Sequence, residues 1–108
     1  MTDECALRVT RRYAAPPTDV WAALTHPDSV ARWLGRPLGT IVREEAPHLL
    51  ELDWRTDGER ASLVRFELTE VDGGTVLVID HTGIAAPRGM AAMGFWRRSI
   101  DHLPMEER

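Results

Sequence analysis

The sequence has one cysteine, Cys5, among its 108 residues, so it cannot form an internal disulfide bond, and a reducing compartment suits it best. The formal net charge of −4 argues against a nucleic-acid partner, because proteins that bind nucleic acids usually carry a basic stripe. No apolar run reaches the length of a transmembrane helix. Asp3 and Glu4 interrupt any N-terminal signal peptide. These absences predict a cytoplasmic protein with neither a nucleic-acid nor a membrane partner.

Motifs that would bind a metal or a cofactor are also missing. The histidines stand far apart, at positions 26, 48, 81 and 102, and no second cysteine accompanies them, so no zinc-ligand spacing exists. The Gly73–Gly74 pair lies in a hairpin turn rather than before a helix, which excludes a phosphate-binding loop. Neither Ser62 nor Ser99 stands in a nucleophile elbow. The sequence therefore predicts no metal, no cofactor and no catalytic residue.

What is present describes one ordinary globular domain over residues 1–108. Hydrophobic residues make up 44% of the chain and charged residues 28%, which is usual for such a domain. A chain of this length can bury one substantial core.

Residues 16–35 predict two short helices joined by a tight corner. Pro17 suits a first helical position, and Asp19 places a carboxylate in the first turn. Thr25 is the expected N-cap of the second helix, and Gly35 is the expected left-handed terminator. Apolar residues recur at helical spacing, at positions 20, 21, 24, 30, 33 and 34. Two large tryptophans in this pair need a concave partner from the rest of the chain.

Alternating apolar residues and turn residues predict five strands, over residues 7–13, 39–44, 49–55, 62–71 and 75–82. The turn signals are Ala46–Pro47, Asp57–Gly58 and Asp72–Gly74. The last four strands follow one another so closely that they predict an antiparallel meander. From Arg88 onward a helical stripe runs through Met93, Trp96, Ile100 and Leu103, widened by Met90 and Phe95. A long C-terminal helix lying across the sheet would bury both apolar faces.

The sequence also resembles a known family. The segments that carry the resemblance are Val9–Pro17, Val20–Leu24, Ala31–Gly35, Phe66–Leu68, Gly74–Leu77, His81–Gly83 and the Trp96, Ile100 and Leu103 spacing. They look like the single-domain homologues of the activator of heat-shock protein 90 ATPase, of the START-like (SRPBCC) helix-grip superfamily. The resemblance implies an α+β helix-grip fold: a curved antiparallel sheet of about five strands, two short helices after the first strand, and a long C-terminal helix across the sheet. It also implies a small, largely apolar ligand, aromatic or acyl, bound between sheet and helix.

One departure from the family pattern concerns the sheet edge. Only Arg36 to Asp53 separates Gly35 from Trp54, which leaves room for about one strand and its return. An early edge strand is therefore expected to be missing or reduced, and the cavity smaller or more open. An uncovered edge, together with outward apolar residues at positions 49, 63, 76 and 78, favours a homodimer.

Two polar residues are candidates for binding the ligand. Alternation places His81 on the face that carries Leu77 and Ile79, where it would either orient a ligand or serve as a hydrogen-bonded histidine at a strand end. Arg11, on the inner face of the first strand, would either bind an anionic group or pair with an acid at the rim. The apolar wall of the cavity is expected to comprise Trp33, Leu52, Trp54, Phe66, Ile79, Met90 and Met93.

Two other functions remain open. Some members of the superfamily are polyketide cyclases or aromatases, and such an enzyme would need further polar groups converging with His81. A co-chaperone-like interaction module is the second alternative, although such family members carry an additional domain that 108 residues cannot contain. We expect a ligand-binding protein rather than an enzyme.

Overall fold

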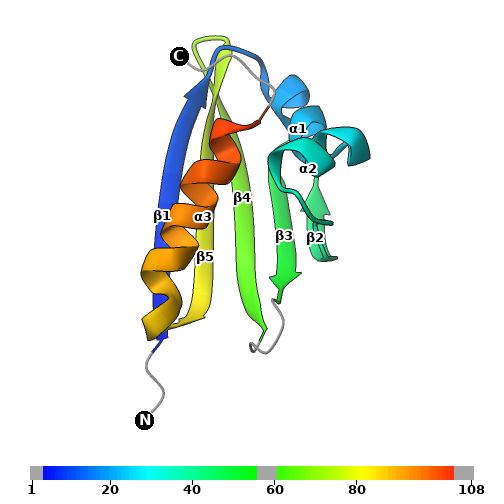
Figure 1. The fold of residues 1–108 in the computed structure, drawn as a ribbon. Helices are drawn as coiled ribbons and strands as arrows, with labels where there is room; N and C mark the ends of the chain where they lie inside the picture. The colour runs from blue at the N-terminus through cyan, green and yellow to red at the C-terminus, as the bar shows by residue number, and fades with distance from the viewer. Residues whose placement is uncertain (1–3, 56–60, 104–108) are drawn as a thin grey trace.

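A computed structural model describes residues 4–55 and 61–103. The elements follow in the order β1 (Glu4–Tyr13), α1 (Pro17–Thr25), α2 (Pro27–Trp33), β2 (Thr40–Glu45), β3 (Leu49–Trp54), β4 (Ser62–Val71), β5 (Gly74–Ala85), a short 3-10 turn (Ala86–Arg88) and α3 (Gly89–Asp101). Figure 1 shows this arrangement. The expected helical pair, five strands and C-terminal helix are all confirmed, whereas the Asp57–Gly58 turn lies outside the described residues.

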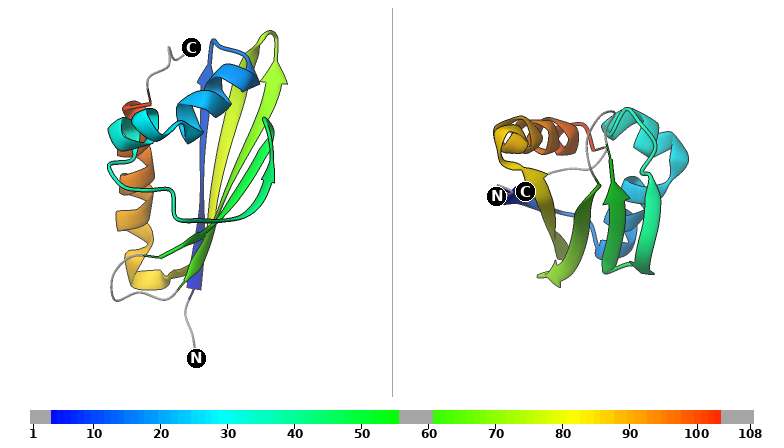
Figure 2. Two further views of the ribbon diagram at one scale, coloured as in Figure 1. Left: turned by 90° about the vertical axis from the view of Figure 1, so that its right-hand side faces the viewer. Right: turned by 90° about the horizontal axis from the view of Figure 1, so that it is seen from below.

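All five strands form one antiparallel sheet in the order β1-β5-β4-β3-β2. The last four strands make the expected meander, and β1 adds to it by pairing with β5. The sheet curves, and all three helices lie on its concave side (Figure 2). Helix α3 lies along β1 and β5, while α1 and α2 cover one end of the sheet toward β2 (Figure 1). This two-layer arrangement is the helix-grip architecture.

Prolines and hydrogen bonds set the corner between α1 and α2. Pro27 occupies the first turn of α2, so the preceding His26 becomes the N-cap, and its Nδ1 accepts a hydrogen bond from the Asp28 amide at 3.2 Å. The prediction of Thr25 as this cap is wrong: Thr25 ends α1, and its hydroxyl donates to the Trp21 carbonyl at 2.8 Å. The indole of Trp33 donates to a carbonyl at the end of α1, that of Leu24, at 3.3 Å.

The core lies between the sheet and the helices. Both tryptophans expected there are buried, Trp33 being 2% exposed and Trp96 0% exposed. Leu52, Phe66 and Ile79 are exposed by no more than 1% and supply the sheet side of the core. Alternation along the strands thus predicts the buried face correctly.

Helix α3 uses a narrower stripe than its sequence indicates. Met90 is 91% exposed, so the expectation that it widens the buried stripe and lines a cavity is wrong. Each step of three residues falls about 60° short of a full helical turn. Met90 and Trp96 are two such steps apart, so they lie about 120° from each other around the helix. Gly89 faces β1 instead, where a Cβ atom would come within 2.8 Å of Cys5 Sγ.

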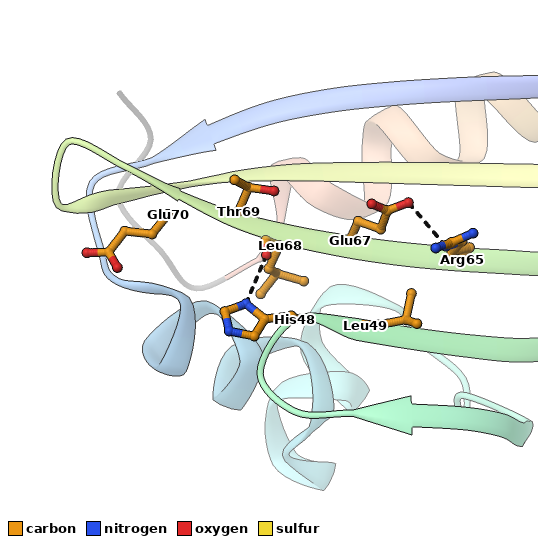
Figure 3. A pocket seen from close by; sticks show the side chains of 7 residues that line it. All are labelled: His48, Leu49, Arg65, Glu67, Leu68, Thr69 and Glu70. Atoms are coloured by element: carbon orange, nitrogen blue, oxygen red, sulfur yellow. Dashed lines mark hydrogen bonds and ion pairs between the residues drawn. The ribbon is translucent and has the colours of Figure 1, made fainter.

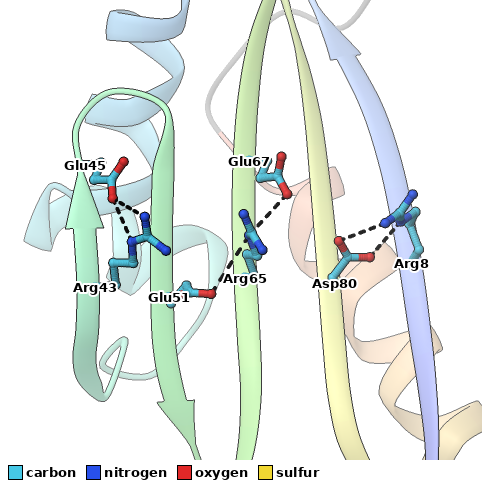
Figure 4. A network of polar contacts seen from close by, with 7 residues as sticks. All are labelled: Arg8, Arg43, Glu45, Glu51, Arg65, Glu67 and Asp80. Atoms are coloured by element: carbon cyan, nitrogen blue, oxygen red, sulfur yellow. Dashed lines mark hydrogen bonds and ion pairs between the residues drawn. The ribbon is translucent and has the colours of Figure 1, made fainter.

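The convex face of the sheet carries a row of charges of alternating sign. Arg43, Glu51, Arg65, Asp80 and Arg8 lie directly opposite one another in successive strands. Arg8 Nε lies 2.7 Å from Asp80 Oδ1, and Arg65 Nε lies 3.1 Å from Glu67 and 3.9 Å from Glu51 (Figure 4). The hydrogen bonds that Arg8 donates to the Asp80 carboxylate, and then the negative charge of Asp80, hold the pKa of Arg8 above its usual value. Exposed ion pairs of this kind contribute little to stability, because water and salt screen them, so the row mainly keeps this face polar.

Strand β2 forms one edge of the sheet, and all six of its residues are exposed. Ile41 and Val42 are 46% and 56% exposed there. A register shift lies between Ile41 and Arg43, and Arg43 pairs with Glu45 at 2.6 Å; bulges and charges of this kind protect an edge from pairing. The edge thus combines apolar exposure with protective features, and the homodimer stays a prediction.

No helix in the described part of the chain is long and apolar enough to span a membrane.

Candidate functional site

Aromatic rings from α3 and the sheet meet in one cluster on the concave side. Trp96 lies at its centre, with ring centroids 5.0 Å from Trp54, 5.8 Å from Phe66 and 5.1 Å from Phe95. Phe95 is also 5.8 Å from Trp54. Most of these pairs are edge-to-face or tilted, arrangements worth about 0.5–1.5 kcal/mol each beyond the burial of area. Trp96 is fully buried and Phe95 only partly, so the cluster runs from the core to the surface.

His81 hydrogen-bonds to the centre of this cluster. Trp96 Nε1 lies 3.0 Å from His81 Nδ1, and an indole nitrogen can only donate, so Nδ1 must be an unprotonated acceptor. The ring proton of neutral His81 therefore sits on Nε2, which donates to Ser62 Oγ at 2.7 Å. The Ser62 hydroxyl in turn donates to the carbonyl of Trp54 at 3.1 Å. One obligate donor thus determines the direction of the whole chain of hydrogen bonds.

This direction decides what the His81–Ser62 pair can do chemically. A serine nucleophile needs a histidine whose facing nitrogen accepts its proton. Here the facing nitrogen carries the proton, so His81 does not activate Ser62. Both ring nitrogens are engaged and the residue is only 4% exposed. Of the two roles considered for His81, this geometry supports the hydrogen-bonded structural one.

Arg11 also has a protein partner. Its Nη1 lies 2.8 Å from Asp101 Oδ1 at the end of α3, and its side chain is 20% exposed. The pair ties β1 to the C-terminal end of the helix. Of the two roles expected for Arg11, this contact is the pairing with an acid at the rim rather than the binding of an anionic group.

The remaining predicted site residues divide between core and surface. Trp33, Leu52, Phe66 and Ile79 are buried, and Trp54 is 5% exposed beside Phe95. Met93 is partly buried against the core, about 60° from Trp96 on the opposite flank of α3 from Phe95. The structure therefore brings Trp54, Phe66 and His81 together around Trp96, and Met90 and Met93 lie apart from them.

Sequence reasoning missed Arg36 altogether. Its guanidinium carbon lies 4.4 Å from the ring centroid of Trp54, and its Nη2 donates to the Arg55 carbonyl at 3.0 Å. Such a cation–π contact near the surface stabilises by about 0.5–1 kcal/mol. Gly35 precedes it with a φ of 72°, which confirms the expected left-handed terminator after α2. No spacing in the sequence relates Arg36 to Trp54, because a loop brings them together.

A shallow groove lies elsewhere, where β3 begins and β4 runs on toward its turn (Figure 3). It has a volume of about 340 Å³ and is lined by His48, Leu49, Arg65, Glu67, Leu68, Thr69 and Glu70. Leu49, Arg65, Glu67 and Thr69 alternate with core residues, so they belong to the convex side. Leu49 was expected to be exposed there but is only 6% exposed. None of the predicted ligand-binding residues lines this groove.

No group of three or more His, Cys, Asp or Glu side chains in residues 4–55 and 61–103 is placed to hold a metal ion. His48 bonds to the Leu68 carbonyl through Nδ1, and His26 caps α2, so these two histidines have local structural partners.

Comparisons with known proteins agree with this architecture. Residues 38–105 match the model of the family described as activator of Hsp90 ATPase homolog 1-like protein. The crystal structure of CalU16 from Micromonospora echinospora is similar at 26% identity and a TM-score of 0.74, covering 95% of this chain and 83% of that one. The protein encoded by BPP1335 of Bordetella parapertussis is 28% identical with a TM-score of 0.73, covering 91% and 72%.

A third solved structure, PFC0360w from Plasmodium falciparum, is described as an HSP90 activator. It is 16% identical with a TM-score of 0.74, covering 89% of this chain and 91% of that one, so it shows a shared fold. The comparison with curated proteins found no match. The family match spans more than half of the chain and coincides with the helix-grip fold described above. The protein belongs to the activator of Hsp90 ATPase homolog 1-like family.

Proposed function

We propose that this domain binds a small, largely apolar ligand on the concave side of the sheet, at the aromatic cluster of Trp54, Phe95 and Trp96. The observation that carries the proposal is the position of Phe95. Its partly buried ring contacts two tryptophans that are almost completely buried, so an apolar ligand can join the cluster without breaking the core. Aromatic rings with a few polar groups nearby are the usual lining of small-molecule sites.

A binding role agrees with the polar groups of the site better than a cyclase-like reaction does. His81 is the one ionisable group hydrogen-bonded within the cluster, among the residues described, and both its nitrogens are engaged. Acid–base catalysis needs a group within reach of the substrate that can exchange a proton. The protein-interaction alternative draws on the description of PFC0360w, whose similarity to this chain extends to the fold.

A neutral apolar dye, N-phenyl-1-naphthylamine, tests the proposal. The folded protein is expected to enhance its fluorescence, and Phe95→Ala to weaken binding about two- to tenfold, the range of one aromatic contact. Met90→Ala is the matched control, since it removes an exposed apolar side chain from the same helix. Absence of binding, or equal weakening by both variants, would contradict a site at Phe95.

A further inference from the structure

We propose that Arg36 makes this site selective for aromatic carboxylates, with the ligand's ring on Trp54 and its carboxylate on the guanidinium. This inference rests on the proposed function and specifies its ligand class. It starts from the geometry of one contact, the guanidinium of Arg36 lying 4.4 Å from the centroid of the Trp54 ring.

Arg36 is the removable cover of the aromatic cluster. Trp54 is 5% exposed, with Trp96, Phe95 and His81 as its other ring neighbours. Trp96 is completely buried and cannot move without disrupting the core. Arg36 is only partly buried and comes from the loop between α2 and β2, and its cation–π contact is weak. A ligand therefore reaches the Trp54 ring most easily by displacing this guanidinium.

The displaced guanidinium has the capacity to bind an anion. It carries five N–H donors, and one of them, on Nη2, donates a hydrogen bond to the Arg55 carbonyl. Within residues 4–55 and 61–103, no carboxylate forms an ion pair with it, in contrast to Arg8 and Arg11. Arginine binds a carboxylate through two parallel hydrogen bonds, which adds strength and direction.

Together these features define one class of ligand. The flat face of Trp54, once uncovered, accepts an aromatic ring, and Arg36 remains within a side chain's length to accept the acid group. The loop that follows Arg36 runs close to β3, since Gly39 has a φ of 94° and a Cβ atom there would lie 3.3 Å from the Asp53 carbonyl. A neutral arene would occupy the same ring face but gain nothing from Arg36.

The test compares 2-naphthoate with its neutral analogue 2-naphthamide by calorimetry on the full chain. The wild type is expected to bind naphthoate about tenfold or more tightly, the ratio that a charge-assisted hydrogen bond provides. Arg36→Met, which keeps an unbranched side chain, should abolish the preference, so that the two compounds bind about equally. Arg32→Met should retain the preference, since Arg32 is exposed and donates within its own helix. Equal binding of both compounds by the wild type, or a preference that survives Arg36→Met, would overturn the role of Arg36 but not the proposed function. If neither compound bound, the proposed function would be overturned as well.

A second measurement needs no variant. In the wild type, naphthoate should shift the NMR resonances of the Trp54 indole N–H and the Arg36 Nε–H together. Binding without these shifts would place the ligand elsewhere and refute the inference.

Discussion

Trp96 on α3 donates its indole N–H to Nδ1 of His81 on β5 at 3.0 Å, and both residues are at least 96% buried. The bond joins the long helix to the sheet at the centre of the aromatic cluster. It also defines a protonation state, because a doubly protonated imidazole would direct a second N–H against that of the indole.

The first prediction concerns the hydrogen bond between Trp96 and His81. His81→Phe keeps a ring of similar size but removes the acceptor of the Trp96 indole N–H, and a buried donor without a partner costs about 1–3 kcal/mol. The free energy of unfolding should therefore fall by about that amount. Urea unfolding measures the loss, and His81→Gln, whose amide oxygen can accept the hydrogen bond, should cost less. Equal losses for the two variants would mean that the hydrogen bond does not contribute.

The second prediction concerns the two buried tryptophans. Trp33→Ala and Trp96→Ala should each lower the free energy of unfolding by about 3–5 kcal/mol, because each leaves a large cavity in the core. A domain with about 5–15 kcal/mol of total stability would then be close to unfolding. Chemical denaturation measures the loss, and Trp21→Ala, at a partly buried position, should cost less. A loss below about 1 kcal/mol for Trp96→Ala would be incompatible with its place at the centre of the cluster.

The third prediction isolates backbone conformation at Gly35. Its φ is 72°, and a Cβ atom there would meet nothing within 4 Å, so any cost of substitution comes from the left-handed conformation alone. Gly35→Ala should destabilise the fold by about 1–2 kcal/mol, and Gly35→Asn by less, since asparagine tolerates this region. Thermal unfolding of the two variants gives the comparison. If both cost the same, the loop relaxes to another conformation.

The fourth prediction concerns assembly. The exposed Ile41 and Val42 on the edge strand β2 favour a homodimer formed by edge pairing. Sedimentation at micromolar concentration should then give twice the monomer mass of 12.2 kDa, and Val42→Pro should restore the monomer by blocking the edge. A wild-type species at the monomer mass would show that the bulge and the charges of β2 prevent pairing.

Local chemistry in the sequence was sufficient to predict the elements and their faces. Pro17 and Gly35 mark the helical pair, and a period of two along β4 separates core residues such as Phe66 from outward ones such as Arg65. These signals work because helix ends, turns and strand faces depend on residues only a few positions apart. The resemblance in those same segments pointed to the correct family and helix-grip fold.

The contacts within the site depended on the tertiary structure alone. Whether His81 met a ligand or a protein group was decided by Trp96, 15 positions away, whose N–H supplies the one donor that orders the hydrogen bonds. Arg36 meets Trp54 across a loop that no periodicity describes. Met90 is exposed because residues three positions apart on a helix are offset by about 60°, and two such steps along α3 turn Met90 away from the face that carries Trp96. Hydrogen-bond partners and burial depend on distances between elements, and packing sets those distances only when the whole chain folds.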